Sequence, residues 1–294
     1  SETVPAGWSL TGNTCNDLTI NGNTSLVSGV PTVSCTLTNT KLSKITVVKD
    51  AVPNSPQDFV FSSGGNLGGF ILDDDSDATR SNQQEFSGLL PGSYSFSETT
   101  VNGWDLTGLT CTGTGVQFSA NGATVNVTLG AGQNITCTFT NTQRGSISGI
   151  KFNDLNGNGV YDQGEPALSG WNIFIDTNND GILDGNELST FTDGDGLYSF
   201  LMLQPTTYNL AEVMQNGWVQ TLSPGSVTVG AGENVTDQNF GNFQNGSIAG
   251  YKFNDINGDG QKQTDEPKLS GWTINLLNDN EDQDSLMNNV VESK

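Results

Sequence analysis

Apolar and polar residues alternate in short segments along most of this 294-residue chain. In the segments 92–99 (GSYSFSET) and 135–142 (ITCTFTNT), every second side chain is apolar until the last one, which is polar. Alternation with a period of two is typical of a β-strand with one buried face. Runs rich in Gly, Asn, Ser and Thr separate such segments and favour turns. The pattern predicts an all-β protein.

Three landmarks recur along the chain at intervals of about one hundred residues, which indicates a repeat. A Glu lies six residues before a Trp, an Asn lies six residues before an Ile, and a Lys lies four residues after that Ile. These landmarks are Glu2, Glu98 and Glu212, then Asn39, Asn141 and Asn242, then Lys49, Lys151 and Lys252.

The register of the landmarks divides the chain into four parts. Two complete modules are expected at 43–144 and 145–244. The C-terminal half of a module precedes them at 1–42, and the N-terminal half of a further module follows at 245–294. The joints are only a few residues long, and such short connections favour a semi-rigid array over flexibly linked domains.

Strand alternation directs the landmark Lys, Glu and Asn toward the core. Glu98 shares a face with Tyr94 and Phe96, and the same count places Lys49 and Asn141 on the apolar faces of their strands. An unpaired buried charge is strongly destabilising, so we expect the three polar side chains of a module to meet.

Two interpretations of a buried Lys, Glu and Asn remain open from the residues alone. Burial lowers the pKa of a Lys and raises that of a Glu, so the amine can attack the Asn side chain while the carboxyl moves protons and ammonia leaves. The product is an intramolecular isopeptide bond. The alternative is a buried Lys–Glu ion pair with the Asn hydrogen-bonded beside it. The candidate bonds join Lys49 to Asn141 and Lys151 to Asn242, with Glu98 and Glu212 as catalytic residues.

Three segments match the calcium-loop pattern D-x-[DN]-x-[DN]-G-x5-E: the first loop at 154–165, the second at 176–187 and the third at 255–266. In this pattern carboxylates, amide oxygens and one backbone carbonyl surround Ca²⁺, and the sixth-position Gly allows a sharp turn. The third loop departs from the others because Gln263 replaces the acid at position nine. The expected ligands are Asp154, Asn156, Asn158, Val160, Asp162, Glu165, Asp176, Asn178, Asp180, Ile182, Asp184, Glu187, Asp255, Asn257, Asp259, Gln261 and Glu266.

Two further acidic segments allow more than one interpretation. Asp193 and Asp195 follow the second loop and either complete a calcium site or form a simple turn. A solvated acidic loop is favoured over a cation site for Asp73, Asp74, Asp75 and Asp77.

The four cysteines keep the register of the landmarks. Both members of a pair are absent from the matching places in 145–244, which is how disulfide partners behave. We therefore expect bridges Cys15–Cys35 and Cys111–Cys137, with four free thiols as the alternative. Two bridges favour an oxidising, extracytoplasmic setting.

Charge and composition exclude several functions. The formal net charge is -22 with only 10 Lys and Arg, which opposes binding to nucleic acid or an anionic membrane and suits divalent cations. Histidine is absent, which removes Ser-His and Cys-His catalysis. No segment resembles a transmembrane run or a signal peptide, as expected for a mature or excised piece.

Several motifs resemble known surface modules. ITVVKD, YSFSETTVNGW and CTFTNT resemble the collagen-adhesin B-type, or prealbumin-like (SpaA-like), modules of Gram-positive surface proteins and pilins. KFNDLNGNGVYDQGEPALSGW and TDGDGLYSF resemble the calcium-binding B modules of serine-aspartate repeat (SdrD-type) adhesins. The resemblance implies an isopeptide with Lys49, Asn141 and Glu98 in the family roles, and the same roles for Lys151, Asn242 and Glu212 in the next module.

The sequence thus predicts tandem prealbumin-like (Ig-like) β-sandwiches of a seven-stranded type with EF-hand-like calcium loops. They would form a structural stalk or fibre segment of an extracellular adhesin or filament and would turn over no external substrate. Expected partners are neighbouring modules of the same or adjacent chains, with no membrane insertion in this segment. One alternative is an accessory stalk of a secreted hydrolase. Another is a head-to-tail pilus subunit in which Lys252 of one chain joins Asn39 of the next, although terminal halves of a longer repeat protein are favoured.

Overall fold

The chain contains two β-sandwiches, preceded by a small sheet and followed by a separate unit. The computed structural model describes residues 2–15, 34–75, 77, 79–115 and 117–276. Every regular element among them is a β-strand, which confirms the all-β prediction. No helix in this part of the chain is long and apolar enough to span a bilayer. By its contacts the chain divides into two compact units, Ser1–Gln244 and Asn245–Lys294.

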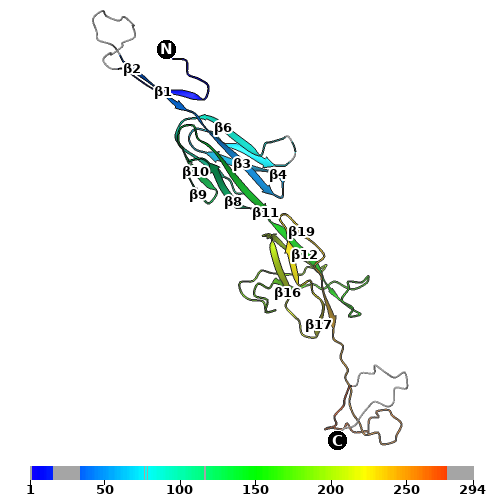
Figure 1. The fold of residues 1–294 in the computed structure, drawn as a ribbon. Coiled ribbons are helices and arrows are strands. Elements are labelled where there is room, and N and C mark those ends of the chain that lie inside the picture. The colour runs from blue at the N-terminus through cyan, green and yellow to red at the C-terminus, as the bar shows by residue number, and fades with distance from the viewer. Residues whose placement is uncertain (1, 16–33, 76, 78, 116, 277–294) are drawn as a thin grey trace, which may run out of the picture. The chain divides into compact units, whose positions relative to one another are not determined.

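Residues 43–144 form the first sandwich (Figure 1). One sheet has the strand order β6-β3-β11-β8 and the other has the order β5-β4-β7-β10-β9. The count exceeds the seven strands expected because the edges of the second sheet carry two five-residue strands, β5 and β9. The strands are β3 (Ser43–Val52), β4 (Ser55–Ser63), β5 (Phe70–Asp74), β6 (Gln83–Leu89), β7 (Gly92–Glu98), β8 (Trp104–Gly113), β9 (Gln117–Asn121), β10 (Thr124–Leu129) and β11 (Asn134–Gln143).

Side-chain alternation builds the core of this sandwich. Along β3 buried and partly exposed residues alternate, and Ile45 and Val47 are fully buried. They belong to one cluster with Phe61 of the opposite sheet and Phe139 of β11. These two rings pack edge to face with centroids 5.1 Å apart. Each large apolar side chain buried in this way contributes about 1.5–3 kcal/mol.

Residues 145–244 repeat the arrangement with shorter strands. The order β15-β12-β20-β17 repeats β6-β3-β11-β8, and β13, β16 and β18 take the places of β4, β7 and β10. In both sandwiches the first strand pairs in parallel with the last strand. The strands are β12 (Gly145–Asn153), β13 (Asn172–Ile175), β14 (Ser189–Phe191), β15 (Leu197–Leu203), β16 (Thr206–Glu212), β17 (Trp218–Leu222), β18 (Ser226–Val229), β19 (Asn234–Val235) and β20 (Phe240–Gln244).

The parts outside the sandwiches hold less regular structure. Strands β1 (Trp8–Cys15) and β2 (Cys35–Lys41) form a two-stranded antiparallel sheet. The unit 245–294 has no strand within its described residues, and an isolated bridge joins Phe253 to Lys268. Neither part forms a two-sheet sandwich in the portion of the chain that the structure describes.

The same backbone contacts recur where one module follows another. A single residue separates β2 from β3 and β11 from β12. At the first joint the Gly132 N–H donates to the Lys41 carbonyl at 3.0 Å, and at the second the Gly232 N–H donates to the Gln143 carbonyl at 2.9 Å. Both glycines have a positive φ, of 68° and 67°, which favours residues without a Cβ. Backbone hydrogen bonds therefore hold each joint.

Candidate functional site

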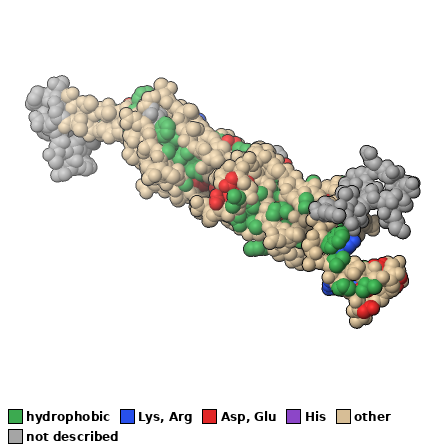
Figure 2. Space-filling model, turned by 90° about the horizontal axis from the view of Figure 1, so that it is seen from below, with side chains coloured by type: hydrophobic (Ala, Val, Ile, Leu, Met, Phe, Trp, Pro, Cys, Tyr) green, Lys and Arg blue, Asp and Glu red, His purple; other side chains and the backbone are tan. Residues whose placement is uncertain are grey.

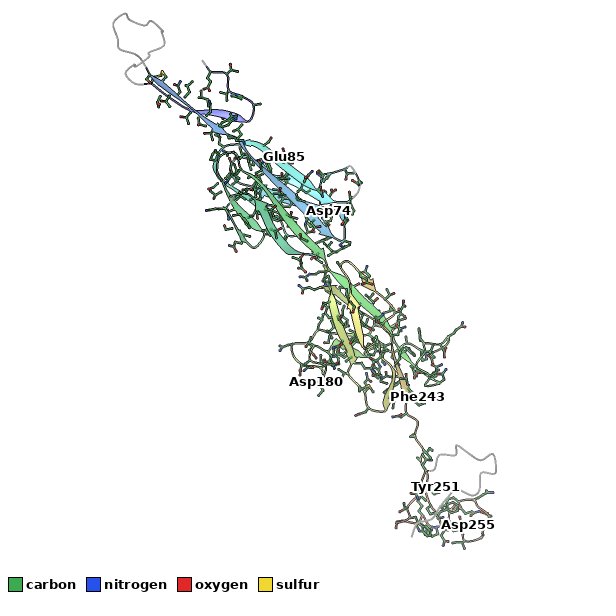
Figure 3. All side chains as sticks on the ribbon, viewed as in Figure 1. Asp74, Glu85, Asp180, Phe243, Tyr251 and Asp255 are labelled. Atoms are coloured by element: carbon green, nitrogen blue, oxygen red, sulfur yellow. A yellow bond between two sulfur atoms is a disulfide. The ribbon has the colours of Figure 1, made fainter. Side chains whose placement is uncertain are left out.

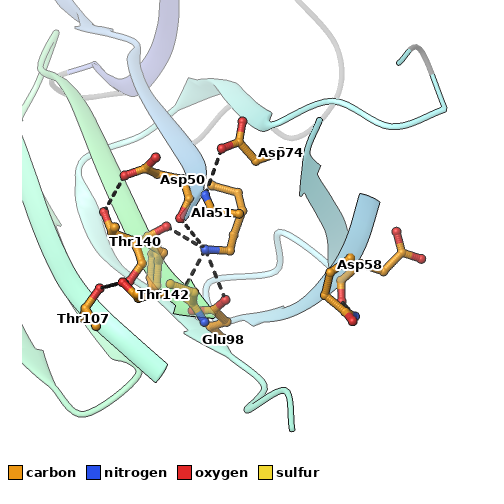
Figure 4. Close-up of polar contacts among 12 residues, drawn as sticks. Asp50, Ala51, Asp58, Asp74, Glu98, Thr107, Thr140 and Thr142 are labelled. Carbon is orange, nitrogen blue, oxygen red and sulfur yellow. Dashed lines mark hydrogen bonds and ion pairs between the residues drawn. The ribbon is translucent and has the colours of Figure 1, made fainter. Parts of the chain in front are cut away.

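The landmark Lys of the first sandwich lies in the core. Lys49 on β3 is 0% exposed. Its Nζ donates to Asn141 Oδ1 at 3.0 Å, to the Phe139 carbonyl at 2.9 Å and to the Asp50 carbonyl at 3.0 Å (Figure 4). The parallel register sets Lys49 opposite Phe139, so Asn141 is the next residue of β11 on the same face. First and last strand thus bring the amine and the carboxamide together.

Glu98 supplies the charge opposite this amine. It ends β7, is 5% exposed, and its Oε1 lies 3.7 Å from Lys49 Nζ, an ion-pair distance longer than a hydrogen bond. Neither carboxylate oxygen has a hydrogen-bond partner among the described residues. The ring of Phe59 lies over the amine, with 4.1 Å between Nζ and the ring centroid.

Burial shifts the pKa of both charged groups toward their neutral forms. Desolvation lowers the pKa of Lys49 from 10.5 to about 8, against the opposing charges of Glu98, Asp50 and Asp74. Desolvation also raises the pKa of Glu98, against the positive charge of Lys49. Both shifts increase the share of neutral amine and neutral carboxylic acid, the forms that attack and protonate a carboxamide.

A small cavity lies beside the carboxyl and the carboxamide. Its volume is about 30 Å³, and Glu98, Asn141, Thr99, Trp104 and Leu106 are among the residues that line it. A water-sized molecule requires roughly 10–15 Å³ of such space. The cavity can therefore hold a water or an ammonia next to the reacting groups.

The second sandwich repeats the cluster. Lys151 is 0%, Glu212 5% and Asn242 0% exposed. The amine hydrogen-bonds Asn242 Oδ1 and lies 2.8 Å from Glu212 Oε2. Desolvation lowers the pKa of Lys151 to about 8, against the charge of Glu212. Trp171 takes the place of Phe59, with its ring centroid 4.4 Å from Nζ.

Sequence reasoning did not identify the aromatic rings over the amines or the hydrogen bond that holds Glu212. Gln220 on β17 donates from Nε2 to Glu212 Oε1 at 2.8 Å. Phe59 and Trp171 come from the sheet or loop facing each lysine, so no local pattern connects them to it.

The segment before β1 and strand β2 bring a third landmark Glu and Asn into contact. Asn39 Nδ2 donates to Glu2 Oε1 at 2.6 Å. Asn39 Oδ1 is shielded from solvent and has no hydrogen-bond partner among the described residues. In the unit 245–294, Lys252 Nζ lies 5.0 Å from the ring centroid of Trp272.

Two disulfides join neighbouring strands. Cys15 pairs with Cys35 across β1 and β2, and Cys111 pairs with Cys137 across β8 and β11. In each case the two cysteines lie directly opposite each other in the sheet. No free cysteine remains.

All three twelve-residue loops share one pattern of internal hydrogen bonds. In the first loop, the N–H of Gly159 donates to Asp154 at 2.7 Å. Glu165 accepts from the N–H groups of Leu155 and Asp162, both at 2.9 Å. Asp154 is 0% exposed and Glu165 is buried. The first and twelfth carboxylates therefore turn into the loop.

The second and third loops repeat these contacts position by position. Asp176 accepts from the sixth-position Gly at 2.8 Å, and Glu187 accepts from positions two and nine at 2.7 and 3.0 Å. Asp255 and Glu266 accept from the same positions of the third loop. Figure 3 locates Asp180 in the second loop and Asp255 in the third. The sixth-position glycines have φ values of 74°, 74° and 76°.

The donor set of these loops fits a hard divalent cation. Carboxylate, amide and backbone carbonyl oxygens are the ligands that Ca²⁺ takes. Asp162 is half-buried, and the other expected ligand residues are exposed at the loop surface: Asn156, Asn158, Val160, Asn178, Asp180, Ile182, Asp184, Asn257, Asp259 and Gln261.

Asp193 and Asp195 form a hydrogen-bonded turn. Asp193 accepts from the N–H groups of Asp195 and Leu197, both at 2.9 Å. Both aspartates are exposed. The two aspartates thus form a turn, and their part in a calcium site stays a prediction.

Three carboxylates gather at the end of β5 and in the segment that follows it. Oxygens of Asp73, Asp75 and Asp77 lie within 4.8 Å of one another, and no other group of three acidic or cysteine side chains within the described ranges comes as close. Asp73 is 2% exposed, and burial together with the charges of Asp75 and Asp77 raises its pKa. Asp74 turns elsewhere and accepts from the Ala51 N–H at 2.9 Å. The expectation of a solvated loop did not include this buried carboxylate.

Basic side chains are scarce at the surface. On the face shown in Figure 2, Lys and Arg form small separate areas among polar side chains and backbone. Arg144 forms two hydrogen bonds to Asp105, at 2.8 and 2.7 Å. The formal net charge of -22 opposes binding to polyanions.

Both sandwiches match known domain families. Residues 45–143 match the family described as a prealbumin-like fold domain, and residues 145–242 match the SdrD B-like domain. Serine-aspartate repeat-containing protein D of Staphylococcus aureus strain Newman is 31% identical over 144 residues, which cover 44% of this chain and 11% of that protein. The same protein of strain MW2 is also 31% identical, with 44% and 10% covered. The matched segment thus spans about a tenth of the length of these curated relatives.

Solved structures of pilins are similar at lower identity. A streptococcal ancillary pilin has 19% identity, with 68% of this chain and 62% of that chain covered and a TM-score of 0.28. BcpA, the major pilin subunit of Bacillus cereus, has 10% identity, with 69% and 100% covered and a TM-score of 0.30. The domain matches confirm the resemblance to prealbumin-like and SdrD-type modules expected from the sequence.

Proposed function

We propose that this chain, in which residues 45–143 belong to the prealbumin-like fold domain family and residues 145–242 to the SdrD B-like domain family, is a stalk segment of a surface adhesin or pilus-like filament. Its location is the cell surface or the extracellular space. The observation that carries the proposal is the buried Lys, Glu and Asn cluster, which recurs between first and last strand in both sandwiches. The chain bears load and turns over no external substrate.

The two clusters are proposed to form isopeptide bonds, Lys49 with Asn141 and Lys151 with Asn242. A neutral lysine amine attacks the side-chain carbonyl carbon of the Asn. The neighbouring Glu takes the amine proton and passes a proton to the departing nitrogen. One secondary amide forms and one ammonia leaves, so the step requires no cofactor or oxidant. The alternative product of the same residues is a permanent ion pair.

The environment of Lys49 supports the bond-forming step. At pH 7, an amine with a pKa of about 8 is neutral in about one molecule in ten, compared with fewer than about one in a thousand at a pKa of 10.5. The amine is fixed 3.0 Å from the carboxamide oxygen of Asn141, which removes most of the entropic barrier to attack. The cavity beside Glu98 gives the departing ammonia room.

Calcium is proposed to bind the three twelve-residue loops. The shared hydrogen bonds turn the first and twelfth carboxylates inward in each loop, where the ion would replace backbone amides as their partner. Ion binding would order each loop and stiffen the segment that follows it. An affinity of about 10⁻⁴–10⁻³ M is expected for an extracellular module.

Intact-mass measurement of the denatured, reduced chain tests the proposed cross-links. Wild type should be lighter than its plain sequence by one ammonia for each bond. Lys49→Ala, Glu98→Ala and Asn141→Ala should each retain one ammonia, while the untouched second sandwich serves as the internal control. A wild-type mass equal to that of the plain sequence would reject both bonds and leave the ion pairs.

A further inference from the structure

The two buried clusters differ at one position of the strand that pairs with the last strand of each sandwich. That strand is β8 in the first sandwich and β17 in the second. On β8 the residue opposite Asn141 is Leu106, and on β17 the residue opposite Asn242 is Gln220. Both lie two residues after the module Trp. The two sandwiches therefore have an apolar side chain and an amide at the same place.

The amide of Gln220 fixes the carboxylate of the second cluster. Gln220 Nε2 donates to Glu212 Oε1 at 2.8 Å, and the other oxygen, Oε2, lies 2.8 Å from Lys151 Nζ. The nitrogen that would leave as ammonia, Asn242 Nδ2, donates to Met214 Sδ at 3.8 Å. The carboxylate is thus held between an amide and the amine, while the carboxamide nitrogen faces a sulfur.

Glu98 of the first cluster has no such donor among the described residues. Its Oε1 lies 3.7 Å from Lys49 Nζ, and neither of its oxygens has a hydrogen-bond partner in that part of the chain. Leu106, Glu98 and Asn141 all line the cavity of about 30 Å³. Because the leucine offers no hydrogen bond, the carboxyl can turn between the amine and the carboxamide.

The hydrogen bond from Gln220 affects the protonation state of the second cluster. A donor to a carboxylate favours its ionised form over the neutral acid. Hydrogen bonds to charged groups shift such an equilibrium by about ten- to a hundredfold. The bond-forming step starts from a neutral amine and a neutral acid, so the donor lowers the share of reactive clusters. The second sandwich should therefore cross-link more slowly than the first.

We propose that Gln220 is a positioning residue that slows the cross-linking of the second sandwich by holding Glu212 as a carboxylate beside the amine. Its counterpart Leu106 lets the first sandwich cross-link faster. This role rests on the proposed function, because it sets the rate of the same reaction. In that reaction Lys151 Nζ bonds to Asn242 Cγ, and the bond from Cγ to Nδ2 breaks. Glu212 takes one proton from the amine and gives one to Nδ2, which leaves as ammonia, and nothing is oxidised or reduced.

Cell-free synthesis of the whole chain gives both bonds a common starting time. Samples are quenched in acid at intervals and digested, and mass spectrometry measures the linked peptides of each sandwich. In wild type the second bond should form at least about ten times more slowly than the first. Gln220 is exposed, so Gln220→Met removes the donor without opening the core, and it should speed the second bond about ten- to a hundredfold. Leu106→Gln should slow the first bond by a similar factor.

The neighbouring position of β17 supplies the matched control. Val219 is 49% exposed and its side chain lies on the opposite face from that of Gln220, so Val219→Met should change neither rate. If both bonds form but Gln220→Met leaves the second rate unchanged, the role of Gln220 is overturned and the proposed function stands. A second bond that Val219→Met speeds equally, or a first bond that Leu106→Gln does not slow, would overturn it too. Absence of linked peptides from every chain would reject the proposed bonds and this role together.

Discussion

Replacing Glu98 by Gln separates the proposed cross-link from the packing around it. The two side chains have nearly the same volume, so the core of the first sandwich stays filled. The carboxyl 3.7 Å from Lys49 Nζ is lost, and Lys49 forms no other ion pair within the described ranges that could move protons between amine and carboxamide. The bond to Asn141 should therefore not form, which removes a closure between residues 92 positions apart in sequence.

The size of the effect follows from the length of the loop that the bond closes. In the chain-entropy model, closing a loop of about 100 residues is worth about 4–5 kcal/mol. In a domain of about 100 residues, 1 kcal/mol shifts the melting temperature by about 4–8 °C. The first sandwich of Glu98→Gln should melt about 20–35 °C below that of wild type. Glu98→Gln also leaves the buried amine of Lys49 without an opposite charge, which lowers the stability further. Adding Lys49→Met should restore only this second part of the lost stability.

Scanning calorimetry combined with intact-mass measurement checks this prediction. Glu85→Gln is the matched control. Glu85 of β6 pairs at 3.0 Å with Lys44, which lies on β3 like Lys49, but the two side chains are exposed by 53% and 41%. An exposed pair contributes about 0–1 kcal/mol, so the control should melt within a few degrees of wild type. The reasoning fails if Glu98→Gln loses as many ammonias as wild type or melts within the range of the control.

Three further predictions concern calcium, pH and the disulfide. Chelation should lower the melting temperature of module 145–244 and leave that of the first sandwich unchanged. At the expected affinity, about 10 mM Ca²⁺ stabilises the module by about 1.4–2.7 kcal/mol per site. An unchanged melting temperature would count against calcium binding. The Asn141→Ala variant cannot cross-link, and the pKa of its Lys49 is about 8 in the folded state and 10.5 in the unfolded state. Between these pH values the unfolded state binds more protons than the folded state. The free energy of unfolding in urea should therefore rise from pH 8 to 10.5 by up to about 3 kcal/mol. A flat or falling profile would contradict it. Replacing Cys111 and Cys137, which lie 26 positions apart, by Ser should cost about 3–4 kcal/mol in urea unfolding, and reducing agent should then have no further effect on the first sandwich.

The period of two in the sequence was sufficient to predict the all-β fold and the inward faces of the strands. Glu98 follows Tyr94 and Phe96 on one face, and the structure buries Phe96 and Glu98. The common register of the modules predicted the module boundaries and the Lys, Glu and Asn landmarks, because each position of a repeat is seen more than once in the sequence. The pairing of Cys111 with Cys137 needed only the observation that both are lost together.

The alternation of apolar and polar residues did not predict which side chains meet between the two sheets. Nothing in the sequence near Phe59 indicates that its ring covers Lys49, since the two residues come from opposite sheets. The five-residue edge strands β5 and β9 were not expected, and β9 buries neither of its faces. Asp73 is buried although it lies at the end of β5 among other acidic residues, and composition does not predict that burial.

The place of the buried clusters would let the proposed stalk resist tension. Force along the chain enters each sandwich through its first strand and leaves through its last strand, and these strands are parallel neighbours in both modules. Pulling on such a pair shears all of its hydrogen bonds together, whereas an antiparallel hairpin opens one bond at a time. With the proposed bond formed, force passes from Lys49 directly to Asn141, and the residues between them carry none. Since backbone hydrogen bonds hold both joints, the next sandwich receives the load at β12, two residues beyond the end of β11.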